Sequence, residues 1–586
     1  MGPNSFRSHQ LCFVAAGLGA KHTSSYNVAA MSTPSQRDLT VYTAAKIITL
    51  NRPLPSATAV AVDNTTGMIV EVGSLETMQP WLDAHPYHID HTFADKYILP
   101  GFIDPHLHPS MAAVLLPMHF ITAMEWRLPW QTVESTKGHH NFVSRLSEIH
   151  EELDDPEEPL ISWGYHQIWH GEMHRRIINA VSDTRPIVVW HRSFHELYMN
   201  DAAIDHFGID RGGVASHPQV DLDAGRFFES GQQLAVAKMN PFLLAPDRFR
   251  LGLERLREAV HFGGHTTIGD MAVGIFDLEM EWQQLVDALD NDSTPFRVHM
   301  VPLAAGRRYV GKSDDDVLAD LASLSERNTG RLEFRDHVKL FTDGAFFSEL
   351  MQVKAPGYID GHHGEWMMPP ERFEERARLM WNAGYRIHVH CTGDLGLQLA
   401  LDTLDKLQFE RPRFDHRFTI EHFGLSTPEQ VTRIAALGAC VSANVYYLHE
   451  LSDAYWRHSI GYERASQMAR LGSLIEAGVP TALHSDFTMA PALPLNSAWV
   501  AVNRRAETGV TMAPDECLTV EQAMRAITID AAYVLGMEDE IGSIRAGKKA
   551  DFTVLEADPY AVDPDELKDI PIWGTVFEGQ PFESQS

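Results

Sequence analysis

The first residues that could do chemistry are two histidines at the end of a short apolar run. Residues Leu99–Ile103 lead through Asp104 to His106 and His108. Alternate side chains of an extended strand point to the same face, so both imidazoles should lie together. Two neutral imidazoles on one face are suitable ligands for a divalent metal. Taken alone, the pair is equally compatible with two hydrogen-bonded histidines in the core.

Three later apolar runs end in residues of the same kind. They terminate at His390, His422 and Asp486, and the first two are 422 − 390 = 32 residues apart, which fits one strand–helix unit. Because active-site residues gather at the C-terminal ends of parallel strands, we predict that these residues share one metal site with the two histidines above. His388 and His484 lie nearby, and for both we favour a packing role.

Lys339 completes the pattern in the middle of the apolar run His337–Phe341. A buried ammonium is costly, and metal cations beside it would repel it. A neutral amine that has captured CO2 avoids both problems, because the two oxygens of the carbamate can bridge two metals. The alternatives are a lysine whose ammonium reaches solvent, or an ion pair with Asp336 or Asp343.

These motifs, in this order, resemble the amidohydrolase superfamily. The resemblance covers about residues 38–580, and within the superfamily the chain is most similar to the long branch that includes N-substituted formamide deformylases. The motifs that match are Pro100–His108, Lys339, His390, Ile420–His422, Ser485–Asp486 and the tail Glu540–Leu555. His195 and Asn200 also look like a feature of that branch near the substrate. The chain departs from the branch at Ala345–Glu349 and Phe487–Met489, which leaves the substrate open.

The resemblance implies a ligand set and a reaction. The more buried metal would be held by His106, His108 and Asp486, the more exposed one by His390 and His422, and carboxylated Lys339 would lie between them. One or two divalent metals, with zinc favoured, would activate a water. Asp486 would pass a proton to the leaving nitrogen and His195 would donate to the oxyanion. The expected reaction is hydrolysis of an amide-type C–N bond in an apolar N-acyl or N-formyl amine; the alternatives are a one-metal deaminase and a non-catalytic scaffold.

The secondary structure that must position these residues is predicted from the pattern of apolar and polar residues along the chain. Between residues 97 and 535, short apolar runs alternate with amphipathic stretches, which indicates a parallel sheet with helices. About eight such units favour a closed (β/α)8 TIM barrel over two doubly wound sheets. Residues 38–96 and 536–586 read as short strands, and we predict that they pair as a small β-sandwich. Residues 1–37 contain no acidic residue and are predicted to be a disordered or targeting extension.

Composition limits the partners. The 586 residues include 48 Lys and Arg against 79 Asp and Glu, a net charge of −31, and 44% are hydrophobic. The apolar content suits a large core, whereas the negative charge disfavours nucleic acid and anionic membranes. No apolar run of about 20 residues is present. We therefore expect a cytoplasmic homo-oligomer, a dimer, acting on a small molecule.

Overall fold

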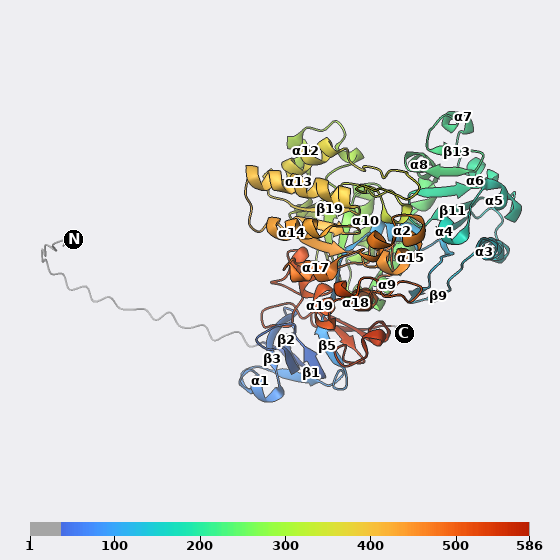
Figure 1. The fold of residues 1–586 in the computed structure, drawn as a ribbon. Coiled ribbons are helices and arrows are strands. Elements are labelled where there is room, and N and C mark those ends of the chain that lie inside the picture. Colours follow the sequence, from blue (N-terminus) through green and yellow to red (C-terminus); the bar gives the residue numbers. More distant parts are fainter. Residues whose placement is uncertain (1–36, 585–586) are drawn as a thin grey trace, which may run out of the picture.

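The computed structural model describes residues 37–584, so nearly all of the extension predicted for residues 1–37 lies outside the described residues. The described chain has a mixed α/β fold. Strands from the two ends of the chain lie together at the bottom of Figure 1, and the helix-covered body lies above them.

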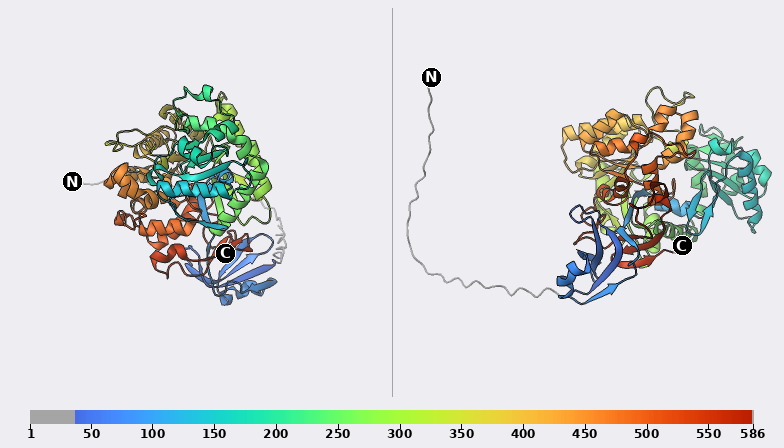
Figure 2. Two further views of the ribbon diagram at one scale, coloured as in Figure 1. Left: turned by 90° about the vertical axis from the view of Figure 1, so that its right-hand side faces the viewer. Right: turned by 60° about the horizontal axis from the view of Figure 1, so that its bottom comes forward.

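The two chain ends pair in one eight-stranded sheet, with the order β25-β24-β23-β5-β1-β2-β3 and β4 beside β1. Its strands are β1 (Leu39–Ile48), β2 (Ser56–Asp63), β3 (Met68–Gly73), β4 (Tyr87–Asp90), β5 (Tyr97–Pro100), β23 (Phe552–Leu555), β24 (Ile572–Phe577) and β25 (Gln580–Glu583). The join is antiparallel, with Leu99 on β5 opposite Thr553 on β23. Figure 2 shows the blue and red strands side by side in the turned views. The two ends therefore pair in a single sheet, whereas the predicted β-sandwich stays a prediction.

The metal-site residues predicted from the sequence lie on two parallel sheets. One has the order β17-β16-β15-β6 and the other the order β18-β19-β20-β21-β22. Their strands are β6 (Phe102–Leu107), β15 (His265–Val273), β16 (Arg297–Pro302), β17 (Leu332–Phe334), β18 (His337–Phe341), β19 (Arg386–Cys391), β20 (Thr419–His422), β21 (Cys440–Ala443) and β22 (Thr481–Leu483). A parallel bridge between Leu303 and Lys339 links the two sheets on one side. The strand pairings do not form one closed barrel, so closure is not shown.

Helices follow most of these strands, as the sequence predicted. They are α9 (Pro246–Phe262), α10 (Leu278–Leu289), α11 (Asp314–Ser323), α12 (Pro370–Asn382), α13 (Asp394–Glu410), α14 (Pro428–Leu437), α17 (Leu471–Glu476), α18 (Pro494–Asn503), α19 (Val520–Ala526) and α20 (Ile529–Val534). Local chemistry sets both ends of helix α14. Thr427 and Gln430 form a capping box, and Gly438 adopts a φ of +70° just after the last turn.

A large insertion separates β6 from β15, and the sequence did not predict its sheet. The strand order is β13-β14-β12-β11-β10-β7, with both parallel and antiparallel pairs. The elements are α2 (Pro109–Leu115), β7 (His119–Phe120), β8 (Trp126–Leu128), β9 (Gln131–Val133), α3 (His139–Glu152), β10 (Leu160–Tyr165), α4 (Gln167–His170), α5 (Arg175–Val181), β11 (Ile187–His191), β12 (Glu196–Met199), α6 (Asp201–His206), α7 (Arg211–Val214), β13 (Val220–Asp221), β14 (Arg226–Phe228) and α8 (Ser230–Leu243). This sheet stands to the right in Figure 1.

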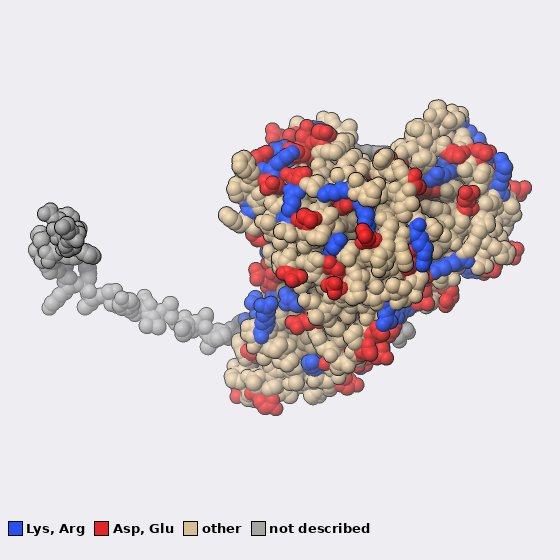
Figure 3. All heavy atoms as spheres, in the orientation of Figure 1, with Lys and Arg blue, Asp and Glu red and all other residues tan. Residues whose placement is uncertain are grey.

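Acidic and basic side chains are interspersed over the face shown in Figure 3, without a continuous basic tract. Within the described residues, every helix is too short or too polar to span a bilayer.

Candidate metal centre

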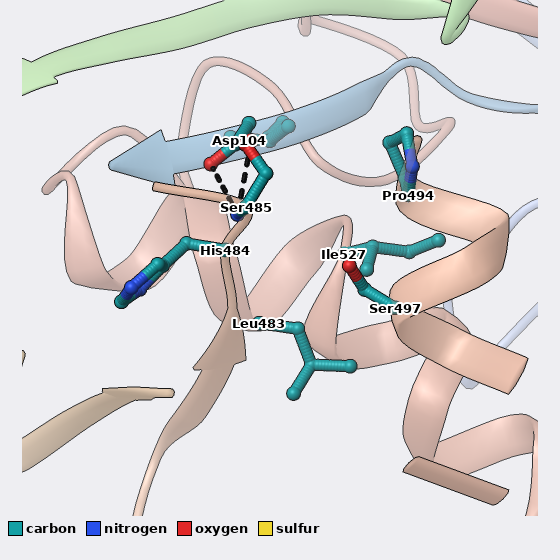
Figure 4. A pocket seen from close by; sticks show the side chains of 8 residues that line it. Asp104, Leu483, His484, Ser485, Pro494, Ser497 and Ile527 are labelled. Carbon is teal, nitrogen blue, oxygen red and sulfur yellow. Dashed lines mark hydrogen bonds between the residues drawn. The ribbon is translucent and has the colours of Figure 1, made fainter. Parts of the chain in front are cut away.

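Backbone hydrogen bonds bring the end of β6 against the segment that follows β22. The Asp486 N–H donates to the His106 carbonyl at 3.0 Å, and the His108 N–H donates to the Phe487 carbonyl at 3.0 Å. Beside them, the backbone N–H and the hydroxyl of Ser485 both donate to the Asp104 carboxylate, as Figure 4 shows. Burial raises the pKa of Asp104 to about 7. Asp104 therefore fixes the loop that carries Asp486.

Three histidines surround the Asp486 carboxylate. Its Oδ1 is 3.1 Å from His108 Nε2 and 3.6 Å from His106 Nε2, and its Oδ2 is 3.6 Å from His422 Nδ1. Two ligand atoms of one tetrahedral zinc ion are about 3.4 Å apart, given metal–ligand distances near 2.1 Å. The separations of the His106, His108 and Asp486 atoms therefore match atoms that share one ion, and His422 belongs to a second group with His106 and His484.

The His106 ring has the protonation state that a metal ligand requires. Its Nε2 is buried and has no hydrogen-bond partner among residues 37–584, while its Nδ1 contacts Glu421. Burial, followed by the nearby Lys339, holds the pKa of His106 well below its usual value. The ring is therefore neutral, and its free lone pair faces the cluster.

Two of these residues have strained backbones at the strand ends. His422 has a φ of +71° and Asp486 a φ of +54°, and Phe423 between β20 and the next loop has a φ of +48°. Non-glycine residues adopt this left-handed region rarely, at a cost of about 1–3 kcal/mol each. Such strain is typical of functional sites, and here it coincides with the predicted ligands.

His390 lies beside the cluster as the sequence predicted, and His484 lies within it. The His390 ring centroid is 4.4 Å from that of His422, and its buried Nε2 has no hydrogen-bond partner in the described chain. The ligand atoms of His106, His422 and His484 all lie within 4.8 Å of one another. His484 Nε2 is 3.2 Å from His422 Nδ1, and its Nδ1 is 2.7 Å from the Ser442 hydroxyl. His484, for which the sequence favoured a packing role, is thus a candidate ligand by position.

Lys339 is buried next to this cluster. Its side chain is 1% exposed, and its Nζ has no hydrogen-bond or ion-pair partner among the described residues. Neither of the ion pairs considered from the sequence forms; Asp343 instead accepts backbone N–H groups from Gln352, Thr392 and Gly393. Burial lowers the pKa of Lys339 to about 8, although the charges of nearby carboxylates oppose the shift. The amine is therefore readily neutralised.

The sequence analysis missed the role of Glu421. This fully buried carboxylate is 2.7 Å from His106 Nδ1 and 2.5 Å from His388 Nδ1. A carboxylate that holds the far nitrogen of a metal-ligating imidazole fixes its tautomer and orientation. The other nitrogen of His388 is 2.8 Å from His337, so His388 has the packing role that the sequence favoured. A Glu inside a buried apolar strand requires a partner that is also buried. The position of Glu421 in an apolar run was therefore the feature of the sequence that could have indicated its role.

His195 comes from the inserted sheet, in the turn between β11 and β12. Its Nδ1 is 3.2 Å from Glu229 Oε2, and its side chain is 25% exposed. Asn200 is fully buried, and its amide caps α6 and is hydrogen-bonded to the backbone of Ile187 and Arg185.

Aromatic side chains lie beside the metal cluster. Two of them, Phe346 and Phe347, come from Ala345–Glu349, where the sequence departs from the formamide deformylase branch. Tyr447 begins a π-helical turn, Tyr447–Leu451, and its ring centroid is 6.4 Å from that of His422. Phe346 stacks on Tyr447 at 4.2 Å, and Phe347 meets it edge-on at 5.5 Å. π-Helical turns occur frequently at functional sites. The surroundings of the cluster are thus strongly apolar.

Comparison with known proteins agrees with this geometry. The Amidohydro_3 model, described as Amidohydrolase family, matches residues 94–582. The chain is 24% identical over 499 residues to the N-substituted formamide deformylase of Arthrobacter pascens, covering 83% of this chain and 88% of that protein. It is also 24% identical over 507 residues to the putative amidohydrolase YtcJ of Bacillus subtilis (strain 168), covering 82% and 88%. Among solved structures, an uncharacterized metal-dependent hydrolase from Pyrococcus horikoshii OT3 has a TM-score of 0.69 at 21% identity, covering 90% of this chain and 99% of that one.

Proposed function

The chain belongs to the amidohydrolase family, and on that premise we propose that it hydrolyses an amide-type C–N bond of an apolar N-acyl or N-formyl amine. It is a metal-dependent hydrolase; the bond and the substrate are what we propose. One observation carries the proposal: ligand-type atoms of His106, His108, His422 and Asp486 converge at ligand spacing at the ends of parallel strands.

The residues present fit a divalent metal. His106 Nε2 and His390 Nε2 are buried acceptors without a hydrogen-bond partner in the described chain, and a metal ion would satisfy both. Imidazole-rich sites with carboxylate oxygens suit zinc, at one or two ions per chain. When bound, the metal supplies a Lewis acid that lowers the pKa of water from about 15.7 towards 7. In our proposal the holding residues are His106, His108, Lys339, His390, His422 and Asp486.

Asp486 is the proposed proton carrier. Its side chain is buried, with 8% of its surface exposed, and its oxygens lie between His108 and His422. In this position Oδ1 or Oδ2 takes the proton of the attacking water and returns it to the leaving nitrogen, a general base and then a general acid. His195 is the proposed donor to the developing oxyanion. Because its Nδ1 contacts Glu229, its Nε2 can donate only when the ring carries both protons.

Lys339 is the proposed bridge between two metals. A neutral Nζ adds to the carbon of CO2 and releases one proton, which gives a carbamate with two ligand oxygens. The buried, unpartnered Nζ supports this modification, because the carbamate would replace an uncompensated cation with an anion that metals neutralise.

The apolar character of the substrate follows from the aromatic surroundings. Phe346, Phe347 and Tyr447 form a stacked group next to His422, and all three are buried. Such surfaces favour apolar or aromatic acyl or amine groups. Phe346 and Phe347 belong to Ala345–Glu349, a segment that departs from the branch, so the substrate need not be that of the deformylase.

The finer architecture is also a proposal. We infer that the two parallel sheets close into a (β/α)8 TIM barrel over residues 97–535, because hydrogen bonds join the ends of β6 and β22 and a bridge joins β16 to β18. We further infer that residues 38–96 and 536–586 form one β-sandwich domain.

A one-metal deaminase is the second candidate, and one observation favours it. The two groups that could hold an ion, His106–His108–Asp486 and His106–His422–His484, share His106 and leave out His390. The test is metal content per chain combined with a screen of N-formyl and N-acyl amines of varied chain length and aromaticity. Two metals and amide hydrolysis support the proposal. One metal per chain, with ammonia released from a ring or amidine, supports the deaminase. If the protein binds no metal, the remaining candidate is a non-catalytic scaffold.

A further inference from the structure

Four buried side chains form a hydrogen-bonded chain that runs from the metal cluster into the interior between the sheets. His106 Nδ1 is 2.7 Å from Glu421 Oε2, His388 Nδ1 is 2.5 Å from Glu421 Oε1, and His337 Nδ1 is 2.8 Å from His388 Nε2. His106, Glu421, His388 and His337 are all fully buried. The proposed reaction uses only the first of them.

For neutral imidazoles, the chemistry of the donors fixes one arrangement of protons along this chain. An ionised carboxylate only accepts, so the Nδ1 atoms of His106 and His388 must both donate to Glu421. His388 Nε2 is then an acceptor, and the His337 Nδ1–H donates to it. Each imidazole carries one proton, pointed toward Glu421, and His106 Nε2 is left with a free lone pair.

The chain ends at His337, because the described residues offer no hydrogen-bond partner to its Nε2. The ring of His299 meets the His337 ring edge-on at 4.6 Å, which restricts its rotation. The parallel register of β18 and β19 places Lys339 opposite His388 and His337 opposite Arg386. His337 therefore holds a fixed position on the strand that also carries Lys339.

Resting on the proposed metal site, we propose that His337 is a positioning residue for the metal ligand His106, acting through His388 and Glu421. Without the hydrogen bond from His337, the His388 ring is free to rotate or to change tautomer. It would then present Glu421 with an acceptor instead of a donor. The carboxylate would shift, and with it the orientation of the His106 ring. Loss of such outer contacts typically weakens metal binding by about 10–100-fold.

The test compares two amide substitutions at His337. Asn places its amide near the position of Nδ1 and can still donate to His388, whereas Gln reaches toward the position of Nε2. We expect His337→Gln to weaken Zn²⁺ binding by about tenfold and His337→Asn by much less. The readout is the dissociation constant of Zn²⁺, measured on the metal-stripped full chain by competition with a chromophoric chelator.

His265 supplies a matched control. Its ring is fully buried, its Nδ1 donates to the Val260 carbonyl at 2.8 Å, and its Nε2 has no hydrogen-bond partner within residues 37–584. His265→Gln should lower the melting temperature of the metal-free protein as His337→Gln does, with no change in Zn²⁺ affinity. Equal Zn²⁺ affinities for the two Gln variants would overturn the proposal.

A double-mutant cycle tests the path of the effect. If His337 acts through Glu421, then His337→Gln should change Zn²⁺ affinity little in a Glu421→Gln background. Equal effects in both backgrounds would refute the path. Wild-type protein that binds no Zn²⁺ would instead refute the proposed metal site, so the two failures are distinguishable.

Discussion

Replacing Lys339 by Met should stabilise the metal-free protein while it abolishes activity. Lys339 is 1% exposed and its Nζ has no hydrogen-bond or ion-pair partner in the described part of the chain. Met has a similar length and no charge, so it fills the space without the cost of a buried ammonium. Substitutions of active-site residues typically increase stability at the expense of activity.

The size of the effect follows from the pKa of Lys339, which burial lowers from 10.5 to about 8. At about 1.4 kcal/mol per pKa unit, this lowering corresponds to about 3 kcal/mol of lost stability at neutral pH. The cost is fully present below the folded-state pKa of about 8. It disappears as the pH rises from 8 to 10.5, because the unfolded chain then binds more protons than the folded one. The advantage of Lys339→Met should therefore shrink from about 3 kcal/mol at pH 7 to about 1 kcal/mol at pH 9.5.

Lys548 is the matched control, because it is a buried lysine with partners. It is 3% exposed, and its Nζ donates to the Ile541 carbonyl, the Ser543 hydroxyl and the Glu538 carbonyl. Burial lowers the pKa of Lys548 to about 8 as well, so the two lysines differ in their hydrogen-bond partners rather than in pKa. Because Lys548→Met leaves three acceptors unpaired, it should leave the protein at least about 2 kcal/mol less stable than Lys339→Met does. The assay is urea unfolding of the chelator-treated, CO2-depleted proteins from pH 7 to 9.5. Destabilisation by Lys339→Met, or equal changes in stability for both variants, would refute the reasoning.

Two other predictions follow from the site and from the contact between the sheets. Asp486→Asn should lower kcat by about 10²–10⁴-fold, because an amide cannot carry the proton, while most of the metal stays bound; His484→Ala should mainly reduce metal content or melting temperature. Near-normal turnover of Asp486→Asn with loss in His484→Ala would assign the proton carrier to His484 instead. Asp551→Ala should lower the free energy of unfolding by about 3–5 kcal/mol, because Arg297 on β16 loses its buried partner. In the same unfolding assay, Asp558→Ala removes the partner of a partly exposed lysine and should cost less than about 1 kcal/mol.

The strand ends that carry the cluster were predictable because they are buried on both faces. Parallel strands covered by helices appear as continuous apolar runs, and a His or Asp that ends such a run is conspicuous. The run His337–Phe341 has the predicted bounds, and the run ending at His390 continues only to Cys391. Lys339 was conspicuous for the same reason.

Other features depend on contacts that no local pattern records. The strands of the insertion are short: β7 and β13 have two residues each, too few for a periodic signal. Between α16 (Tyr462–Ser466) and α17 the chain leaves the helical conformation, and Ala469 has a φ of +48° there. Alanine gives no signal for such a break.

The role of Glu421 was hidden because its partners are distant in the chain. His106 is 315 positions away, and the two meet only when β6 and β20 occupy the same interior. The same holds for His484, which joins the cluster through contacts with His422 and Ser442. The sequence indicated which residues could bind metal, whereas the division into ligands and supporting residues required the three-dimensional arrangement.

The most direct test of the metal centre is a titration of metal-stripped protein with Zn²⁺, in which bound metal per chain and amide hydrolysis are measured at every step. We expect no turnover without metal, and turnover that rises with occupancy and saturates at two ions per chain. Full turnover in the metal-stripped protein, or saturation with no ion bound, would contradict the proposed centre.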